Sequence, residues 1–550
     1  MDSRNFQRTF SRQERQALGF FNTPSSIAHL LKKMTPTGRV LDPSCGTGEL
    51  LIPQIELRAK KGQTLKSILR EVQGIEIDER IANEAKKNYM NTLKKFGFKI
   101  SISEIPIYCA DALDLDSKII KSLEGEFDSI VGNPPWILWP NISKENQAQW
   151  KILAKEYQLS LPKGIFSRLG HSNDDVGVAF AMVTSCFYLK HGGTATFVLK
   201  RNIMRNTTGR IFRELKVKNR DIGIKLIYDF DDIFPFGLDV GAETAIFSWE
   251  MDAKTEFPIK TFVLNNNLSE NDFWTIELKN SLFSSSEIVP LGEDHSLPWI
   301  DKTLFSKAFG RNNHEIRHGI KQDAGKVFSV DPKVLDIEKG LIFPYLKSKN
   351  IEKWKIKSYS YRIIPLKKTN EKNSLWLKKE YPKTYNYLLK NQKTLLNRKS
   401  IWLKSGEFYN AFGIGEYTWA PYKVAWCRLG FKPDFVVIST VEDHTLGSKP
   451  LIPGDHFMFI PFKDKYEAYY VCGLLNSEPI QEAITALALK SKSSLTKGVI
   501  QSIRIPPYDD VAKNIARLSK GLHGELSEEK RTEYEIKLNL EARNILSKPA

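Results

Sequence analysis

Short apolar runs rich in β-branched residues alternate with amphipathic stretches through the first half of the chain. Each run has the length of a buried strand, and the stretches between them carry apolar residues at helical spacing. Strands that alternate with helices form a parallel sheet covered on both faces. The pattern therefore predicts an α/β fold with a doubly wound, mostly parallel seven-stranded sheet. The strands are expected at residues 39–41, 72–77, 105–109, 127–131, 194–199, 224–228 and 242–249.

The pattern changes after Trp249. Residues 251–300 are irregular and rich in Asn and Ser, which favours a connection. Shorter mixed elements follow, and the chain ends in a charged stretch with helical spacing. We therefore predict a first domain at residues 1–250, a connection at 251–300 and a second, mixed α+β domain at 301–550 with a helical tail.

Much of the net charge of +17 lies in one segment of the second half. Residues 341–410 contain 17 basic and 4 acidic side chains together with twelve aromatic residues. Basic side chains neutralise phosphates, and aromatic rings stack on bases or pack in a core. A nucleic-acid partner and a solvated lysine-rich face are both consistent with this composition. Candidate phosphate contacts are Arg398, Lys399 and Lys404.

The composition disfavours several other classes of protein. No run of about 18 uncharged apolar residues is present, which disfavours a membrane span. The first residues are polar, which disfavours a secretory signal. The five cysteines are scattered and include no CxxC pair, so we expect reduced thiols and no zinc or other metal site. These features are typical of a cytoplasmic protein.

A tight turn with two glycines follows the first predicted strand, in the sequence Val-Leu-Asp-Pro-Ser-Cys-Gly-Thr-Gly-Glu-Leu of residues 40–50. Gly46 and Gly48 allow the backbone to approach a ligand closely. The third glycine of a dinucleotide-binding fingerprint is missing, because that position is Leu51. The acidic Asp42 beside the turn also argues against a pyrophosphate and suits a cationic group such as an amino-acid ammonium.

Two further acids stand at the ends of predicted strands. Glu76, followed by Ile77, ends the second strand, where an acid accepts hydrogen bonds from ribose hydroxyls in doubly wound folds. Asp111, followed by Ala112, comes after the third strand and suits the exocyclic amine of an adenine. Each acid alone is more simply a helix cap or a solvated loop residue. Together with Asp42 they indicate a ligand that is a nucleoside carrying an amino acid.

The fourth predicted strand runs into Asn133-Pro134-Pro135-Trp136. The prolines fix φ and hold the loop in one shape. The amide oxygen of Asn133 and the carbonyl of Pro134 are two acceptors that could localise the lone pair of an aromatic amine, which is otherwise a poor nucleophile. Trp136 offers a flat face for stacking an extruded base. A structural loop with a buried tryptophan is the simpler alternative.

These motifs resemble, in the same order, those of the DNA amino-methyltransferases of the gamma class, over residues 15–250. The resemblance begins at Gly19-Phe-Phe-Asn-Thr-Pro24 and includes a later Gly192-Gly193 strand motif. It implies a class I S-adenosylmethionine-dependent methyltransferase fold, with S-adenosylmethionine as the cofactor. The implied cofactor-binding residues are Phe21, Thr23, Asp42, Pro43, Ser44, Gly46, Gly48, Glu76, Ile77, Asp111, Ala112 and Asn133.

The resemblance also implies the substrate and its contacts. The residues that act on the base would be Asn133, Pro134, Pro135 and Trp136, with Phe234 of the segment 232–235 closing over the flipped base from the other side. Asn133 favours the N6 amine of adenine in double-stranded DNA, whereas Trp136, in place of the usual Tyr or Phe, keeps the N4 amine of cytosine open. We expect a monomer on DNA, without a metal, as the modification component of a type II restriction-modification system. A cognate endonuclease in the same system is possible, and the resemblance implies no stable complex with it.

The second half resembles the target-recognition region of the same enzymes less specifically. The matching stretches are residues 317–321, 341–347, 381–399, 474–477 and 503–507. The resemblance implies DNA recognition by this half, without indicating which side chains read bases.

Three alternatives to a separate DNA methyltransferase are disfavoured. Glutamine-modifying enzymes of translation factors use a similar loop, and an RNA or protein substrate follows from that comparison, but they lack a basic C-terminal domain of this size. A fused nuclease is disfavoured because the resemblance starts at Gly19 and the second half shows no nuclease constellation. A catalytically silent DNA-binding subunit is disfavoured by the intact Asp42, Glu76 and Asn133.

Overall fold

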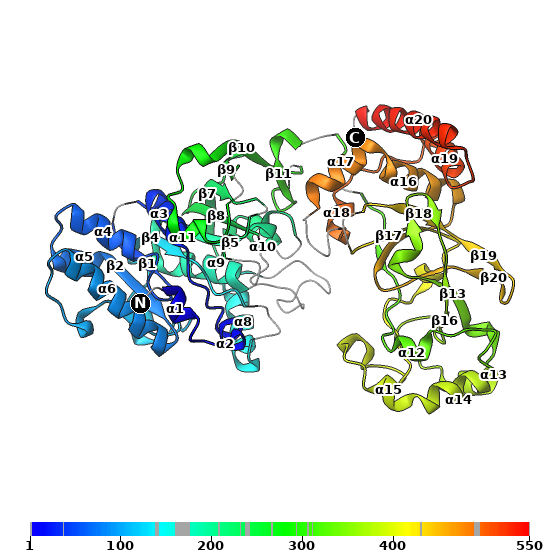
Figure 1. Cartoon of the computed structure of the whole chain (residues 1–550), viewed down its shortest axis with the longest axis horizontal. Coiled ribbons are helices and arrows are strands. Elements are labelled where there is room, and N and C mark those ends of the chain that lie inside the picture. Colours follow the sequence, from blue (N-terminus) through cyan, green and yellow to red (C-terminus); the bar gives the residue numbers. More distant parts are fainter. Residues whose placement is uncertain are drawn as a thin grey trace. The chain divides into compact units, whose positions relative to one another are not determined.

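The computed structural model divides into two compact units, Met1–Phe305 and Ser306–Ala550 (Figure 1). Each unit has its own core and is described separately. The structure describes residues 3–36, 38–137, 142–159, 176–206, 209–231, 233–236, 243–265, 268–292, 294–304, 307–310, 312–429, 432–488 and 495–548.

Unit 1 is built on a large sheet whose central strands are parallel. Burial on both faces explains why the sequences of these strands are continuous apolar runs. In spatial order the parallel strands are β3 (Ile107–Cys109), β2 (Val72–Glu76), β1 (Val40–Asp42), β4 (Phe127–Gly132) and β5 (Leu189–Lys200). The next strand, β8 (Thr244–Met251), is antiparallel to β5 and to its other neighbour, β7 (Arg220–Asp229).

The sheet does not end at these seven strands. Strand β9 (Ile259–Leu264) pairs with β7, and β10 (Phe283–Pro290) and β11 (Trp299–Asp301) extend the same edge. The short strand β6 (Lys216–Val217) also pairs with β7. In the described residues the sheet therefore has eleven strands. The expectations of seven strands and of a connection over residues 251–300 are therefore wrong. Strand β10 is largely exposed along its length, so its serines hide the strand pattern in the sequence.

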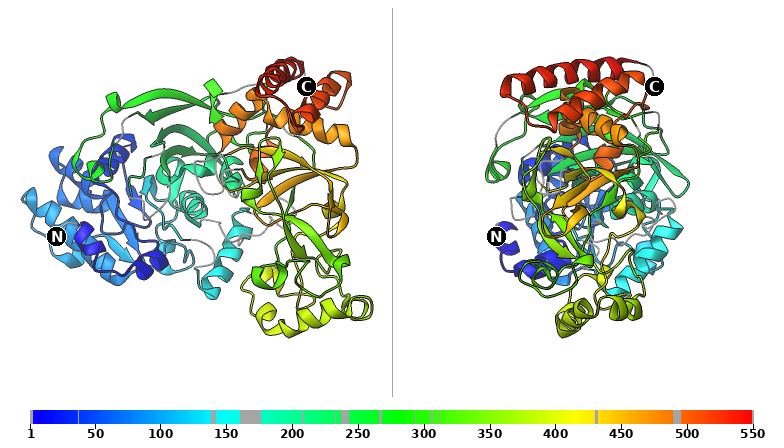
Figure 2. Two further views of the ribbon diagram at one scale, coloured as in Figure 1. Left: turned by 45° about the vertical axis from the view of Figure 1, so that its right-hand side comes forward. Right: turned by 90° about the vertical axis from the view of Figure 1, so that its right-hand side faces the viewer.

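Helices cover both faces of the sheet. Val40 of β1 packs with α3 (Ser25–Met34), whereas its neighbour Leu41 packs in the cluster that contains α9 (Val176–Tyr188). Helices α4 (Ile52–Lys60), α5 (Leu65–Glu71) and α6 (Glu79–Lys95) pack around the β2 end of the sheet. Helix α9 is buried along nearly all its length, which matches its almost entirely apolar sequence. The helices on the two sides of the sheet can be followed in Figure 2.

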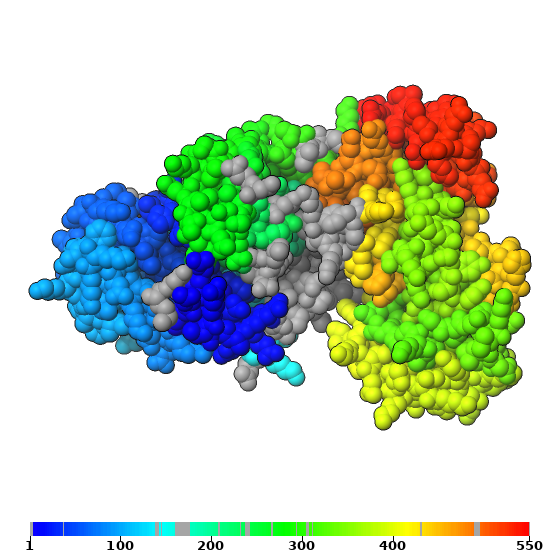
Figure 3. All heavy atoms as spheres, in the orientation of Figure 1, coloured from blue at the N-terminus to red at the C-terminus, as the bar shows by residue number. Residues whose placement is uncertain are grey.

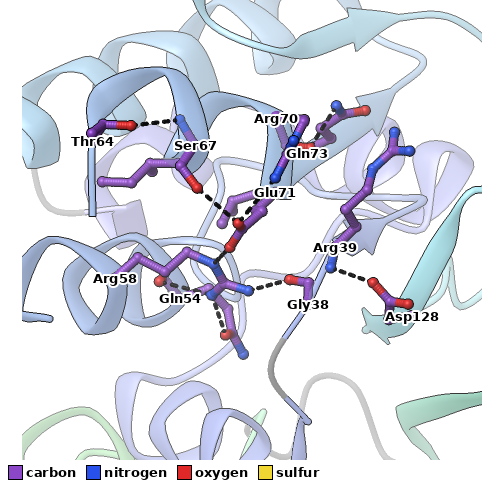
Figure 4. A network of polar contacts seen from close by, with 12 residues as sticks. Gly38, Arg39, Gln54, Arg58, Thr64, Ser67, Arg70, Glu71, Gln73 and Asp128 are labelled. Atoms are coloured by element: carbon purple, nitrogen blue, oxygen red, sulfur yellow. Dashed lines mark hydrogen bonds and ion pairs between the residues drawn. The ribbon is translucent and has the colours of Figure 1, made fainter. Parts of the chain in front are cut away.

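A buried arginine fixes the start of β1 (Figure 4). The Arg58 guanidinium of α4 donates to the Gly38 carbonyl, to the Gln54 side chain and, over 3.0 Å, to Glu71 of α5. Next to Gly38, the backbone N–H of Arg39 donates to Asp128 of β4. Because a buried charge is costly unless its donors are satisfied, this network holds α4, α5 and the entry to β1 in one arrangement.

The N-terminal helices α1 (Ser3–Gln7) and α2 (Arg12–Leu18) lie on the surface of unit 1, where the dark blue residues adjoin the green segment that contains α11 (Asp272–Thr275) (Figure 3). The Arg4 guanidinium lies 5.0 Å from the centre of the Trp274 ring. Helix α2 ends at Gly19, which adopts the left-handed conformation.

The described residues of unit 2 form a four-stranded sheet, a three-stranded sheet and two strand pairs, β14 (Ile351–Glu352) with β15 (Lys355–Ile356) and β19 (Thr440–Asp443) with β20 (Gly447–Pro450), together with helices. The first sheet is antiparallel and consists of β12 (Arg317–His318), β22 (Phe457–Phe462), β17 (Tyr422–Cys427) and β18 (Phe435–Ile438). Helix α16 (Lys465–Asn476) packs on it, followed by α19 (Asp510–Leu522) and α20 (Glu528–Ser547). The second sheet, β16 (Ser360–Ile363), β13 (Ile342–Leu346) and β21 (Ile452–Pro453), carries a helical lobe formed by α13 (Ser374–Glu380), α14 (Pro382–Lys390) and α15 (Gln392–Leu396).

Candidate functional site

The glycine turn lies at the carboxyl end of β1 and is fastened to the end of β2. Gly46 and Gly48 have φ values of +54° and +92°, which side chains other than glycine rarely adopt. The Gly46 N–H donates to Glu76 Oε2 over 3.0 Å, and the Cys45 N–H donates to the Ile75 carbonyl. Hydrogen bonds to the neighbouring strand β2 therefore fix the conformation of the turn.

Two of the predicted acids lie buried beside this turn. Asp42 accepts a hydrogen bond from the Ser44 N–H (3.1 Å), and Glu76 accepts a second one from the Asp78 N–H (3.0 Å). Burial raises the pKa of Glu76 to about 7. Burial, together with the nearby charges of Glu76 and Glu49, holds the pKa of Asp42 well above its usual range. Groups in this condition favour a ligand that brings positive charge or hydrogen-bond donors.

Asp111 lies after β3 and is partly buried. It accepts a hydrogen bond from the Leu113 N–H over 2.9 Å, and burial raises its pKa. Asp42, Glu76 and Asp111 all line one cavity, as the positions of the strand ends predict.

Asn133, directly after β4, has one end of its amide bound and the other free. Its Nδ2 donates to the Phe21 carbonyl (3.1 Å) and to Thr23 Oγ1 (3.2 Å). Its Oδ1 is buried and has no hydrogen-bond partner within the described part of the chain. The two acceptors determine which end of the amide is nitrogen. The amide oxygen is therefore a fixed, unused acceptor of a residue that lines the cavity.

Trp136 does not line the cavity, where a residue that stacks on an extruded base was expected. Its side chain is buried, with its ring centre 6.0 Å from that of Phe21 and 4.7 Å from that of Phe236, and it does not line the cavity. The backbone around it packs closely on the N-terminal segment, because a Cβ on Gly19 would lie 2.7 Å from the Trp136 nitrogen. In this arrangement the indole is part of the core and offers no open face for a base.

The cavity has a volume of about 250 Å³ and gathers most of the predicted site residues. The predicted residues that line it are Phe21, Thr23, Asp42, Pro43, Ser44, Gly46, Glu76, Ile77, Asp111, Ala112, Asn133 and Pro135. Gly48, Pro134 and Phe234 do not line it. Phe234 is half-buried, and Phe236 is the residue of its segment that contacts Trp136. The neighbouring Asp232 lies outside the described residues.

The sequence motifs did not predict several residues that line the cavity. Asn22 and Glu49 line the cavity and stand next to predicted site residues in the sequence, so their position beside the motifs could have identified them. Asn146, Gln149 and Trp150 come from α8 (Lys144–Glu156), and Phe180 comes from α9. No motif marks the helical positions, because their only signal is a shared helix face.

In unit 2, the proposed phosphate contact at Arg398 is wrong. Its guanidinium is buried and donates to four backbone carbonyls, those of Gln322, Leu395, Phe408 and Asn410. Lys399 and Lys404 are exposed. The stretch 474–477, which resembles part of a target-recognition region, has a structural role inside unit 2. Its Asn476 accepts a hydrogen bond from the Phe435 N–H (3.1 Å) and donates one to the Phe435 carbonyl (2.8 Å).

Within the described ranges, no cluster of three or more His, Cys, Asp or Glu side chains could hold a metal ion. None of the described helices is both long and apolar enough to cross a membrane. The five cysteines are free thiols.

A parallel sheet with acids at its first strand ends and an Asn-Pro-Pro-Trp loop at the fourth is consistent with an α/β methyltransferase fold and resembles the domain of DNA amino-methyltransferases. The comparisons confirm this resemblance for residues 5–220, which match the family model described as N-6 DNA Methylase.

Two curated relatives extend the comparison. The chain is 24% identical over 502 residues to the type II methyltransferase M.NspV of Nostoc sp. (strain ATCC 29411 / PCC 7524), an alignment that covers 88% of this chain and 95% of that protein. It is also 24% identical to the modification methylase CviBIII of Paramecium bursaria Chlorella virus NC1A, over 42% of this chain and 50% of the relative.

Solved structures share the fold. The type IIL restriction-modification enzyme MmeI, determined in complex with DNA, superposes with a TM-score of 0.61 at 13% identity, covering all of this chain and 79% of MmeI. A nuclease-deletion mutant of the type ISP enzyme LlaGI, bound to a DNA substrate mimic, gives a TM-score of 0.53 at 13% identity over 92% of this chain and 54% of that one.

Proposed function

We propose that this chain transfers a methyl group from S-adenosylmethionine to the N6 amine of an adenine in duplex DNA, as the modification component of a restriction-modification system. The observation that carries the proposal is the Asn133 amide, whose nitrogen is tied to Phe21 and Thr23 and whose oxygen is buried without a partner in the described part of the chain. The match to the N-6 DNA methylase family and the alignment with M.NspV support the same reaction.

The cavity fits the proposed cofactor. Asp42 and Glu76 are buried acids with raised pKa values, which suits an ammonium group and ribose hydroxyls. Asp111 and the exposed face of Ile77 suit the amine and the ring of an adenine. S-adenosylmethionine, when bound, supplies a methyl group made electrophilic by a sulfonium centre.

The chain itself prepares the amine. In the proposed reaction the Asn133 Oδ1 and the Pro134 carbonyl accept hydrogen bonds from the two N–H groups of the target amine, which shifts its lone pair away from the ring. Because Nδ2 is held by Phe21 and Thr23, Oδ1 keeps its position without reorganisation. The buried loop excludes water, which strengthens both hydrogen bonds. No strong base is needed, since the attacking amine loses its proton only after it has gained a positive charge.

Unit 2 is the proposed DNA-recognition part of the molecule, and we expect a monomer to act on DNA. The alignment with M.NspV runs through this unit, and the segment 341–410 remains strongly basic. Because Arg398 is used internally, the phosphate contacts belong to exposed lysines.

Cytosine N4 is the second candidate target, because Trp136 stands where adenine-specific enzymes usually carry Tyr or Phe. One experiment separates the candidates. Mixed-sequence DNA is incubated with the purified chain and S-adenosylmethionine carrying a labelled methyl group, digested to nucleosides and analysed by mass spectrometry. Label in N6-methyldeoxyadenosine supports the proposal, label in N4-methyldeoxycytidine replaces adenine by cytosine, and no labelled nucleoside contradicts both.

A further inference from the structure

One wall of the cavity is formed by a helix that the methyltransferase motifs do not include. Helix α8 contributes Asn146, Gln149, Trp150 and Leu153 to the lining. These residues are spaced i, i+3, i+4 and i+7, so they form a single helix face. The helix begins at Ser143, whose side chain accepts a hydrogen bond from the Asn146 N–H.

The C-terminal end of α8 is anchored to the rest of unit 1. The Lys218 N–H donates to the Tyr157 carbonyl over 2.8 Å, and Lys218 Nζ lies 3.1 Å from a carboxylate oxygen of Glu156. Trp150 and Leu153 share a core cluster with Ala112 and Leu113. The cavity face of α8 therefore lies over the loop that carries Asp111, which is the end of the cavity assigned above to the adenine.

The polarity of this helix is unusual for a purely structural one. Asn146 and Gln149 both line the cavity, Asn146 as an exposed residue and Gln149 as a half-buried one. Ile152, in contrast, lies on the outer side with 68% of its surface exposed. A helix that served only to cover a core would bury the isoleucine and expose the Gln149 amide, which is the reverse of what α8 shows.

We infer that Asn146 and Gln149 bind the adenosine part of the cofactor, with Trp150 and Leu153 as the apolar wall behind them. An amide offers both a donor and an acceptor, which matches the mixed edge of a purine and the ribose hydroxyls. The ligand class is thus a purine nucleoside. The inference rests on the proposed function, which it deepens by adding two cofactor-positioning residues from outside the motifs.

The test is the binding of S-adenosylhomocysteine to the full chain without DNA, measured by isothermal titration calorimetry. Each of Asn146→Ala and Gln149→Ala is expected to weaken binding roughly 5- to 20-fold, the usual effect of removing one ligand hydrogen bond. Ile152→Ala, on the outer face of the same helix, is the matched control and is expected to bind as the unaltered chain does. The same amide variants should weaken the binding of adenosine and leave that of L-methionine unchanged, both measured as competitors.

The outcomes separate the two proposals. If the unaltered chain does not bind S-adenosylhomocysteine, the proposed function fails. If it binds but both amide variants keep its affinity, or if Ile152→Ala weakens binding as much as they do, the assignment of α8 is overturned and the proposed function stands. A thermal unfolding midpoint equal to that of the unaltered chain shows that a variant with weak binding is folded.

Discussion

The side-chain oxygen of Asn133 is a buried acceptor without a partner in the described part of the chain, whereas the nitrogen of the same amide is bound. The two bonds from Nδ2 reach Phe21 and Thr23, residues that precede the first strand, so the N-terminal segment fixes the orientation of the amide. Residue type alone identified Asn133, but its orientation depends on these distant partners.

Replacing Asn133 by Ala is expected to lower kcat about 10²- to 10³-fold, because an acceptor preorganised for the reacting group is removed. The affinity for S-adenosylhomocysteine should change little. Single-turnover methylation and calorimetry measure the two quantities. Thr23→Val removes one of the two anchors and should lower kcat by a smaller factor, about tenfold. Normal turnover in Asn133→Ala would contradict the mechanism.

The pKa of Glu76, raised to about 7 by burial, predicts a pH dependence. The folded pKa lies above the unfolded value, so this group's contribution to stability is greatest below the unfolded pKa near 4.5 and falls as pH rises toward 7. A ligand that donates hydrogen bonds to the ionised carboxylate lowers its pKa and releases a proton on binding.

At about pH 6, binding of S-adenosylhomocysteine should therefore release a proton fraction that calorimetry detects in buffers of different ionisation enthalpy. Affinity should increase as pH rises from about 5.5 to 7.5. The Glu76→Gln variant serves as the control and should release a smaller fraction. Equal release by the variant and the unaltered chain would exclude Glu76 as the source.

Among the elements, the buried parallel strands were predictable within one or two residues, except that β5 begins five residues before the run expected at 194–199. Their apolar runs and the turn after β1 are local signals. Strands β9 to β11 were missed because the segment 251–300 that contains them is rich in Ser and Asn, and three of the serines lie on β10 itself. The cavity face of α8 and the burial of Trp136 and Arg398 depend on contacts between distant segments, which residue type does not reveal.

The turn at Gly19 packs against the Asn133–Trp136 loop. It has a φ of +64°, and a Cβ there would lie 2.7 Å from the backbone nitrogen of Trp136. Gly19→Ala is expected to lower the free energy of unfolding by more than the roughly 1–2 kcal/mol that left-handed backbone costs alanine, and to lower kcat by shifting the loop. Denaturant unfolding and turnover assays test this.

Gly62 provides the matched control for Gly19. It has a similar φ of +73°, and a Cβ there would meet nothing within 4 Å. Gly62→Ala should therefore show the backbone cost alone and keep normal turnover. Equal decreases in stability and activity in both variants would mean that the packing of Gly19 against the loop is unimportant.

For the whole molecule, exposed lysines of unit 2 are the expected source of DNA affinity. Lys390, Lys393 and Lys399 are exposed residues of the helical lobe and its margin. Changing all three to Glu should weaken DNA binding at least about tenfold and reduce the slope of log Kd against log salt by about 0.9 for each phosphate that a lysine no longer neutralises. Fluorescence anisotropy over a range of salt concentrations measures both.

A second triple variant controls for net charge. Lys94, Lys95 and Lys99 of unit 1 are also exposed, and changing them to Glu alters the net charge of the chain equally. This variant should retain more of its DNA affinity than the first. Similar decreases in the two variants would show that total charge matters and that the location on unit 2 does not.

The fixed amide of Asn133 also has a consequence for damaged DNA. Deamination turns adenine into hypoxanthine and replaces its amine by a carbonyl oxygen. In the proposed reaction that oxygen would face Oδ1, lone pair against lone pair, and the anchored amide cannot turn over to offer its nitrogen without breaking two hydrogen bonds. Repulsion between the two oxygens would thus disfavour binding of a deaminated base, and only intact adenines would be methylated.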